Sequence, residues 1–441
     1  MSLVDRIRAA GVVGAGGAGF PAHVKAAARV EFILANGAEC EPLMHKDAEL
    51  MQRYADRVVA GVAALMEETG AQTGIIGLKA KHERAIEALS AHVRDDIRLH
   101  ILDDFYPTGD EYVLVHAATG RLIPPGGIPL NVGVVVQNVE TLYNIDRARE
   151  GQPVTHKFLT VAGAVRQPVS CAVPVGVTFR ELLQVAGGAT TDDVAVLVGG
   201  AMMGWLTRDL DQRVTKTTGG LIVLPGDHAL IGRLERPEAA MHQIGKSTCD
   251  QCTYCTELCP RFLLGYDLQP HKVMRSLGFT LGGAEFWSEY GVLCCECGLC
   301  TLYACPEDLY PREACQQSKR LSREKQFSWP GKGTLSGTDV VEVHPLSGSR
   351  RIPLKNLVQR LGLTPYDVPA PLTEIELQPR QVQLPMVQHI GAPAERVVRE
   401  GQRVDAGELV GEIPREALGA RVHASIAGTV RTEAETVIIE S

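Results

Sequence analysis

The sequence contains no block of basic residues and no long uninterrupted apolar run. Its 44 lysines and arginines stand against 52 aspartates and glutamates, which gives a formal net charge of −8. A nucleic-acid-binding surface needs clustered positive charge, so that class of function has no electrostatic support. The longest apolar stretches, such as 194–206, contain glycines and fall short of the ~18 residues that a membrane-spanning helix needs. We expect no nucleic-acid partner and no direct membrane span.

Two further absences concern the ends of the chain. Nothing at the N-terminus resembles a secretory signal, so we expect a cytoplasmic protein without a disulfide framework. Residues 3–10 instead carry their apolar side chains on one helical face, which favours a short helix docked on its own domain over a targeting or encapsulation helix. No lysine follows Lys355, which excludes covalently bound biotin or lipoate near the C-terminus.

Cysteine is plentiful, and most of the 12 cysteines fall in two short segments. The first segment is Cys249-x2-Cys252-x2-Cys255-x3-Cys259 followed by proline. This is the spacing of bacterial ferredoxins that carry two iron–sulfur clusters, in which three cysteines bind one cluster and the fourth binds the other.

The second segment, CCECGLCTLYACP, repeats these spacings with one additional residue before its last cysteine. The extra residue lengthens a loop without removing a ligand, because the last cysteine serves the more distant cluster. Cys295 lies beside Cys294 and is an alternative to it as a ligand. We predict one [4Fe–4S] cluster bound by Cys249, Cys252, Cys255 and Cys305, and a second bound by Cys259, Cys294, Cys297 and Cys300.

Structural zinc in two four-cysteine sites is the alternative, because paired C-x2-C units also suit tetrahedral zinc. A third cysteine at the same spacing in each segment and the terminal Cys-Pro favour iron–sulfur clusters. Cys171 lies outside both segments and is interpreted as a packed thiol. The two clusters predict an electron-transfer protein.

A length of 441 residues predicts about three or four domains. The first part alternates strands, at 73–79 and 97–102, with helices, at 48–69 and 82–92, which predicts a mostly parallel sheet covered by helices. We expect a multidomain α/β protein. Its predicted parts are an α/β domain at 1–152, a β-rich domain at 153–230, a helical two-cluster domain at 235–326, a wrapping linker at 327–380 and an all-β barrel at 381–441.

A glycine-rich loop at 11–21 precedes the first strand of the α/β domain, which we expect at 30–34. Without side chains, the backbone N–H groups of such a loop can approach a phosphate closely. A tight structural turn is the alternative, and the loop does not follow a clear strand as the dinucleotide-binding fingerprint requires. The strand ends at an acidic turn, NGAECEP, whose carboxylates suit hydrogen bonding to ribose or ribityl hydroxyls.

The ordered set GAGGAGFP, NGAECEP, YPTGDE and VVVQNVETL resembles the Rossmann-like flavin- and NADH-binding domain shared by RnfC proteins and the flavoprotein subunit of respiratory complex I. The resemblance implies that the glycine loop and the QNVET segment hold FMN, and that the acidic turn and the Gly-x-Glu element face NADH. The cofactor-binding residues that it implies are Gly14, Gly16, Gly17, Gly19, Phe20, Lys25, Asn36, Glu39, Glu41, Gly109, Glu111, Gln137, Asn138 and Thr141.

The chain departs from the complex I pattern at two of these motifs. Ala38 stands where that pattern has an aspartate, and Gln137 stands where it has a second asparagine. Both follow the RnfC branch, and the change at Ala38 bears on NADH more than on FMN. No side chain is predicted to act as a catalytic acid or base, and His23, His45 and His116 are assigned no role.

The remaining modules extend the resemblance over nearly the whole chain. The β-rich part resembles the soluble-ligand-binding β-grasp (SLBB) module, and the C-terminal part resembles the barrel-sandwich hybrid of biotinyl and lipoyl carriers. In RnfC proteins a similar barrel precedes the flavin domain, whereas here it follows. This order resembles the cobalamin reductases of bacterial microcompartments.

This resemblance implies an NADH-dependent oxidoreductase that passes electrons through FMN and two clusters to a corrinoid or another electron-acceptor protein. It further implies a location inside a bacterial microcompartment, with an adenosyltransferase and a shell protein as partners. Two alternatives stay open at this point. One is an RnfC-like subunit of an ion-translocating ferredoxin:NAD oxidoreductase, and the other is a microcompartment electron relay that does not bind NADH.

Overall fold

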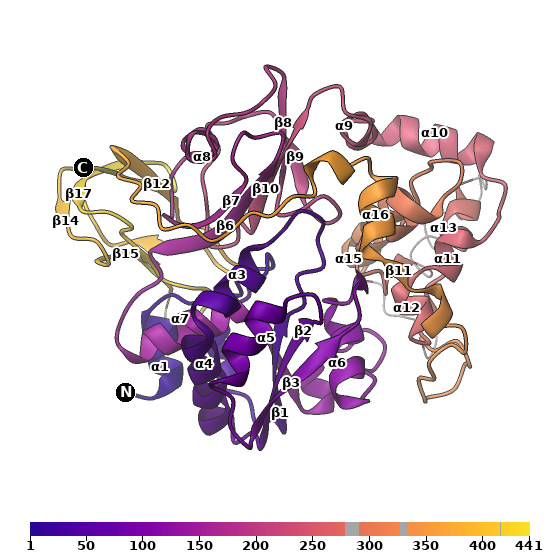
Figure 1. Cartoon of the computed structure of the whole chain (residues 1–441), viewed down its shortest axis with the longest axis horizontal. Coiled ribbons are helices and arrows are strands. Elements are labelled where there is room, and N and C mark those ends of the chain that lie inside the picture. Colours follow the sequence, from indigo (N-terminus) through magenta and orange to yellow (C-terminus); the bar gives the residue numbers. More distant parts are fainter. Residues whose placement is uncertain (278–290, 327–332, 415) are drawn as a thin grey trace.

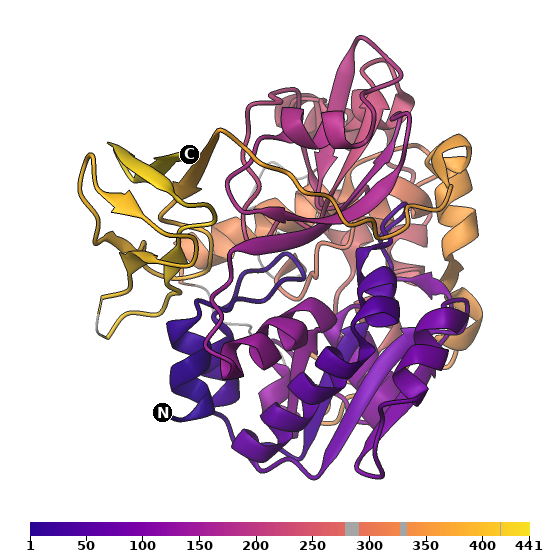
Figure 2. The same ribbon diagram turned by 60° about the vertical axis from the view of Figure 1, so that its left-hand side comes forward.

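The computed structural model describes residues 1–277, 291–326, 333–414 and 416–441. Positions 278–290 of the predicted cluster domain, 327–332 of the predicted linker and 415 of the predicted barrel lie outside the described residues. The described chain forms four parts, with the N-terminal α/β domain beneath a β-rich domain, a helical cysteine-bearing domain at one end and the C-terminal barrel at the other (Figures 1 and 2).

A four-stranded parallel sheet forms the centre of the N-terminal domain, in the order β3-β2-β1-β5. Alternate side chains of β1 enter two different cores. Ile33 packs with helices α4 and α7 on one face, whereas Leu34 packs with Leu114 of α6 on the other. The strands are β1 (Phe32–Gly37), β2 (Thr73–Lys79), β3 (Ile97–Leu102) and β5 (Val134–Asn138). The predicted parallel α/β sheet is therefore confirmed.

Helices of 5 to 15 residues cover this sheet. The first helix begins with a capping box between Ser2 and Asp5 and buries Ile7, so it is docked on its own domain as expected. The helices are α1 (Leu3–Ala9), α2 (Ala22–Ala26), α3 (Lys46–Arg53), α4 (Ala55–Thr69), α5 (Glu83–Ser90), α6 (Glu111–Thr119) and α7 (Val139–Arg149), with a 3-10 turn η1 (Pro129–Val132) before β5.

The single helix expected at 48–69 was wrong, because the chain forms α3 and α4 with a break at Tyr54. Tyr54 leaves the helical backbone region, with φ −127° and ψ 39°. Its ring packs against Tyr143 and Phe158, at centroid distances of 5.1 and 5.8 Å. This aromatic cluster lies between the N-terminal domain and the β-rich domain, so the break serves a packing contact that the periodicity of the sequence does not reveal.

The β-rich domain and the C-terminal barrel share one hydrophobic core. Leu159 and Val161 of the former and Val382 and Val410 of the latter belong to a single cluster of buried side chains. The β-rich sheet has the order β7-β6-β10-β8-β9, with strands β6 (His156–Gly163), β7 (Val169–Pro174), β8 (Val194–Val198), β9 (Trp205–Thr207) and β10 (Gly220–Pro225) and helix α8 (Phe179–Val185).

The barrel consists of two small antiparallel sheets, β12-β18-β17-β14 and β13-β15-β16. Its strands are β12 (Gln381–Pro385), β13 (Glu395–Arg396), β14 (Arg403–Val404), β15 (Leu409–Glu412), β16 (Val422–His423), β17 (Gly428–Glu433) and β18 (Thr436–Glu440). The expected all-β module is present.

The cysteine-bearing domain is built from short helices joined by tight turns. They are α9 (Ala229–Leu234), α10 (Glu238–Thr248), α11 (Tyr254–Glu257), α12 (Pro260–Leu263), α13 (Pro270–Ser276), a π-helical turn η2 (Cys300–Ala304) and α15 (Pro311–Glu324). No helix in the four described ranges is long and apolar enough to cross a bilayer.

The segment between the helical domain and the barrel crosses the molecule (Figure 1). It contacts the helical domain, where His344 N donates to the Leu263 carbonyl at 3.0 Å, and two other parts. Its strand β11 (Ile352–Pro353) pairs with β4 (Phe105–Tyr106) of the N-terminal domain. Further along, the carbonyl of Pro371 accepts a hydrogen bond from the backbone of Ser170 in β7. Its other elements are η3 (Gly348–Arg350), α16 (Leu354–Arg360) and η4 (Thr364–Tyr366).

Candidate functional site

A large cleft of about 380 Å³ opens at the carboxyl ends of β1 and β5. The N-terminal domain, the β-rich domain and the second cysteine segment all contribute to its walls. All but two of the implied cofactor-binding residues line it, namely Gly14, Gly16, Gly17, Phe20, Lys25, Asn36, Glu39, Glu41, Gly109, Glu111, Gln137 and Asn138. Gly19, which belongs to the glycine loop, and Thr141, which bonds to that loop, lie outside the lining.

The glycine loop is held from behind and leaves its tip open to the cleft. The hydroxyl of Thr141 accepts a hydrogen bond from Ala15 N at 2.9 Å, and the carbonyl of Gly19 accepts one from Ile390 N of the barrel at 3.0 Å. At Gly17 the backbone has φ +107°, and a Cβ atom there would project into space with no atom within 4 Å. The cleft therefore has a backbone-lined wall where a cofactor can lie against N–H groups, which fits FMN.

Below the loop lies a buried network of two lysines and two carboxylates. Glu140 is fully buried and accepts hydrogen bonds from Lys157, from Lys46 at 3.0 Å and from the backbone of Phe158 at 3.1 Å. Lys46 also donates to Asp47 at 2.6 Å, and Asp47 accepts from Asn138 at 2.8 Å. Lys46 and Asp47 line the cleft, so this network forms part of its floor.

The two carboxylates of the acidic turn are already bonded to backbone N–H groups. Glu39 accepts from Asp47 N at 2.7 Å and Ala48 N at 3.0 Å, and Glu41 accepts from Met202 N at 2.9 Å and Met203 N at 3.0 Å. Burial raises the pKa of each carboxyl to about 7, and the nearby Asp47 contributes at Glu39. These side chains therefore fix the walls of the cleft.

Glu111 is the more available carboxylate. Its side chain is 46% exposed and lies 3.4 Å from Lys25 Nζ, which in turn donates to the carbonyl of Val136 at 3.0 Å. The N-cap of α6 is Asp110, whose side chain accepts from the backbone of Tyr112 and Val113, so Glu111 is not needed to cap that helix.

The first cysteine set surrounds a separate, smaller pocket. Cys249, Cys252, Cys255 and Cys305 line it, as the spacing predicts for one cluster. Left-handed backbone at Gln251 and Thr253, with φ 63° and 69°, lets the loop curve around the cavity. Sulfur atoms also accept hydrogen bonds there, from Gln251 to Cys249 at 3.1 Å and from Leu309 N to Cys305 at 3.3 Å. This cavity therefore fits a cluster with thiolate ligands.

The second set lies between that cavity and the large cleft. Burial raises the pKa of Cys259, and the neighbouring Cys295 and Cys294 add to the effect. Cys297 and Cys300 are buried close to Cys259 as well. Cys295 and Cys297 also line the large cleft. Cys294 and Cys295 both lie near Cys259.

Several residues of the cleft were not predicted from the sequence. Lys46 and Asp47 carry no recognisable pattern, although they follow the acidic turn closely. Gly199 and Met203 come from the GGAMMG stretch between β8 and β9, where repeated glycines could have suggested a backbone that approaches another group. Cys171, in contrast, is fully buried in the β-rich domain, as expected for a packed thiol.

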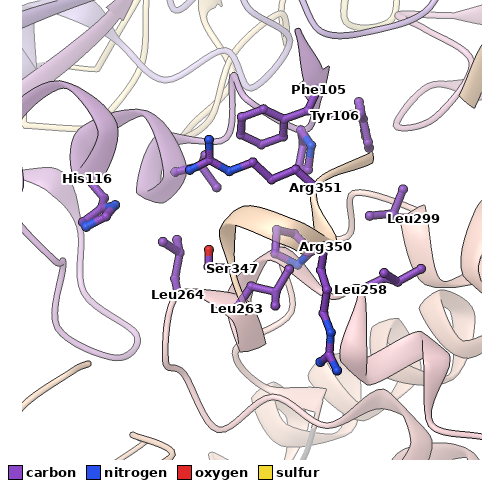
Figure 3. A pocket seen from close by; sticks show the side chains of 13 residues that line it. Phe105, Tyr106, His116, Leu258, Leu263, Leu264, Leu299, Ser347, Arg350 and Arg351 are labelled. Carbon is purple, nitrogen blue, oxygen red and sulfur yellow. The ribbon is translucent and has the colours of Figure 1, made fainter. Parts of the chain in front are cut away.

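A smaller apolar pocket separates α6 from α12 (Figure 3). His116 of α6 and Phe105 of β4 line it on the N-terminal side, and Leu258 and Leu263 line it on the cysteine-bearing side. Arg351 of the crossing segment stacks over the Phe105 ring at 4.7 Å, so this segment helps to join the two domains.

Comparison with protein families matches four modules along the chain. They are the Nuo51 FMN-binding domain at 7–147, the SLBB domain at 158–206, the 4Fe-4S dicluster domain at 248–310 and the RnfC barrel sandwich hybrid domain at 369–440. The cobalamin reductase PduS of Salmonella typhimurium is 46% identical over 435 residues, which cover 98% of this chain and 95% of that protein. The chain belongs to the PduS family. The PduS protein of Citrobacter freundii is also 46% identical, over 97% of this chain and 94% of its own length.

More distant relatives share part of the chain. One component of the Na⁺-translocating ferredoxin:NAD⁺ oxidoreductase complex of Acetobacterium woodii is 36% identical over 57% of this chain and 56% of that protein. Among solved structures, an NAD⁺-reducing [NiFe]-hydrogenase is similar with a TM-score of 0.48 and 21% identity, covering 72% of this chain and 62% of the other.

These matches confirm the multidomain α/β architecture with its FMN-binding, SLBB, dicluster and barrel-sandwich modules. They also confirm the expected cofactors, because the first module is an FMN-binding domain and the third is a 4Fe-4S dicluster domain. The zinc alternative is thereby set aside. The PduS-family protein is an oxidoreductase that transfers electrons with FMN and [4Fe–4S] clusters.

Proposed function

We propose that this protein passes electrons from NADH through FMN and two [4Fe–4S] clusters to a corrinoid, which it reduces to cob(I)alamin. The observation that supports this path is that one cleft is lined by the glycine loop, by the QNVET segment and by Cys295 and Cys297 of the second cysteine segment. A flavin in that cleft would lie against the cluster-binding segment without intervening protein.

The glycine loop and the residues around it bind the flavin in this proposal. The open backbone at Gly17 approaches the cofactor, and Lys25 and Asn138 add polar contacts from two sides of the cleft. Thr141 and the backbone of Ile390 fix the loop from behind, through Ala15 and Gly19. FMN supplies the conversion of a two-electron hydride into single electrons, because each cluster accepts only one electron at a time.

The positions of the two cysteine sets give an order to the path. Cys297 lines the cleft, so the cluster of Cys259, Cys294, Cys297 and Cys300 is proximal to the flavin in this proposal. Cys300 and Cys255 lie close enough for their charges to interact, which connects the proximal cluster to the set formed by Cys249, Cys252, Cys255 and Cys305. Cys249 and Cys252 are partly exposed, so the distal cluster is the exit toward the acceptor.

NADH would bind where Gly109 and Glu111 line the cleft. Asn36 holds this segment by donating to the Gly109 carbonyl at 2.9 Å. Ala38 is fully buried beneath it, and a Cβ atom on Gly109 would lie 3.3 Å from the Ala38 side chain. Alanine at position 38 supplies no carboxylate to a dinucleotide. We therefore propose that the half-exposed Glu111 bonds the dinucleotide, with Glu39 and Glu41 shaping the site.

The corrinoid acceptor is inferred from the PduS relatives, which are cobalamin reductases and align over nearly the full chain. Cob(I)alamin is easily reoxidised, so it should pass directly to the enzyme that alkylates it. An adenosyltransferase is therefore the partner in this proposal. We further propose that the protein works inside a bacterial microcompartment and contacts a shell protein there. Anaerobic pull-down with tagged protein, followed by identification of bound proteins, tests both partners.

The test of the path is reconstitution under anaerobic conditions followed by NADH addition. Bleaching of the flavin, EPR signals from reduced clusters and formation of cob(I)alamin are expected in that order. Reduction of ferredoxin but not of corrinoids would favour the role of the ion-translocating complexes, one component of which is 36% identical over 57% of this chain. Flavin that dithionite bleaches and NADH does not would favour a relay without an NADH site.

A further inference from the structure

Arg261 lies buried between the flavin cleft and the second cysteine segment. It belongs to α12, directly after Cys259 and Pro260, and is 8% exposed. Its guanidinium stacks 3.4 Å over the Tyr112 ring centroid, donates to Asp110 Oδ2 at 2.8 Å and contacts the thiol of Cys295. A fixed positive charge is therefore held against the segment that binds the proximal cluster.

Asp110 holds this arginine with one oxygen and the wall of the cleft with the other. Its Oδ1 accepts from the backbone of Tyr112 at 3.1 Å and Val113 at 3.3 Å, and so caps α6. Its Oδ2 accepts from Arg261. Gly109 and Glu111 on either side of Asp110 line the cleft. The ion pair thus joins the flavin domain to the cysteine-bearing domain at the point where an electron would cross.

A second observation concerns the hydrogen-bonding capacity of the arginine. The Nε atom of Arg261 is buried and has no acceptor in the part of the chain that the structure describes. A buried N–H without an acceptor is costly, and thiolate or sulfide sulfur of a cluster accepts such bonds. Hydrogen bonds and charges near a cluster are among the factors that set its reduction potential.

We propose that Arg261 and Asp110 are positioning residues that together set the reduction potential of the proximal cluster. This inference rests on the proposed function, because it assigns a cluster to Cys259, Cys294, Cys297 and Cys300. Reduction adds one electron to the cluster, so a nearby positive charge favours the reduced state and a nearby negative charge opposes it. The pair is balanced, and each single substitution leaves the opposite charge behind.

The balance makes the two single variants move the potential in opposite directions. Arg261→Gln leaves Asp110 uncompensated and should shift the midpoint potential to more negative values. Asp110→Asn retains an oxygen to cap α6 and leaves Arg261 uncompensated, so it should shift the potential to more positive values. The double variant removes both charges and should return the potential close to that of the wild type.

The experiment is an anaerobic redox titration of the reconstituted full-length protein, followed by EPR and poised with mediators. The matched control is Arg320→Gln on α15, whose charge pairs with Glu238 on an exposed surface and should leave the potential unchanged. Iron, sulfide and flavin contents are measured for every variant. Arg261→Lys retains the charge without the stacked fork, so its midpoint potential should lie closer to that of the wild type than the potential of Arg261→Gln does. It can still be titrated if Arg261→Gln folds poorly.

The proposal is overturned if the two single variants shift the potential in the same direction, or if neither shifts it while both clusters and the flavin are fully bound. The titration uses neither NADH nor a corrinoid, so its outcome is separate from the donor and acceptor of the proposed function. A wild-type protein that reconstitutes with only one cluster would instead contradict the two-cluster path itself.

Discussion

Replacing Glu140 with glutamine tests whether the buried charge network supports the flavin cleft. The glutamine keeps an oxygen for the backbone of Phe158 but removes the charge that compensates Lys157 and Lys46. Removing one partner from a buried ion pair costs about 3–5 kcal/mol. For a unit of 150–250 residues this corresponds to a melting temperature lower by about 6–20 °C. Because Lys46 and Asp47 line the cleft, FMN affinity should also fall.

The loss of stability should depend on pH in a predictable direction. Burial, opposed by Glu140, lowers the pKa of Lys157 to about 8 in the wild type. Without Glu140 this pKa falls further, because Lys157 then has the charge of Lys46 nearby and no carboxylate in contact. Below pH 8, Lys157 is protonated in the folded wild type and deprotonated in the folded variant. In the unfolded state of both proteins, Lys157 keeps its proton up to a pKa of about 10.4. The deficit should therefore shrink as pH rises from 6 to 8, by up to about 1.4 kcal/mol per pH unit.

The assay is thermal unfolding of anaerobically reconstituted protein at pH 6, 7 and 8, with flavin release measured by fluorescence. Glu150→Gln is the matched control, because Glu150 forms a surface pair with Arg57, is 46% exposed and should change stability by less than about 1 kcal/mol. Equal melting temperatures for Glu140→Gln and wild type, or a deficit that grows between pH 6 and 8, would refute the reasoning about the network.

Three further predictions address the cleft and the joint between domains. Gly17→Val forces a branched side chain into backbone with φ +107° and into the cleft, so the purified variant should contain little FMN, whereas full flavin content would make the loop only a structural turn. Glu111→Gln should weaken NADH binding by ~1.5–3 kcal/mol, roughly ten- to a hundredfold, as measured by stopped-flow bleaching of the flavin, and an unchanged apparent dissociation constant would remove Glu111 from the NADH site. Burial lowers the pKa of Lys216 to about 7, so the wild type should gain stability relative to Lys216→Met as pH rises from 7 toward 10. A melting temperature difference, wild type minus variant, that stays constant or falls over this range would contradict the prediction.

Local sequence patterns predicted much of the fold. The strands at 73–79 and 97–102 form as expected. The first is almost wholly buried, as apolar residues between turn signals predict, whereas the second is an edge strand in which Arg98 and His100 alternate with apolar residues. Cys249, Cys252, Cys255 and Cys305, which the spacing assigns to one cluster, line one pocket. In these cases the information lies within a short stretch of chain or in a fixed spacing.

Features that depend on distant contacts could not be predicted in the same way. The break at Tyr54 depends on Tyr143 and Phe158, and the bonding of Glu41 depends on Met202 and Met203. In both cases the partner residues are distant in the sequence and cannot be identified from local composition. The core shared by the β-rich domain and the barrel likewise joins residues more than 200 positions apart, such as Val161 and Val382.

The same limit applies to the interior of the cleft. Twelve cofactor-site residues that the resemblance implies do line it, but the resemblance did not distinguish those that face a ligand from those that hold the walls. Glu39 is used to bind the start of α3, and Thr141 is used to hold Ala15. Only the three-dimensional contacts separate these supporting roles from the role proposed for Glu111.

The most direct test of the proposed electron path is a single anaerobic experiment on reconstituted protein with NADH and hydroxocobalamin. The wild type should form cob(I)alamin, detected by its absorbance, after the flavin bleaches. Cys252→Ala, which removes a ligand of the distal cluster, should retain FMN and NADH-dependent bleaching but form little cob(I)alamin. Formation of cob(I)alamin at the wild-type rate by a Cys252→Ala protein that lacks the distal cluster would contradict the path through both clusters.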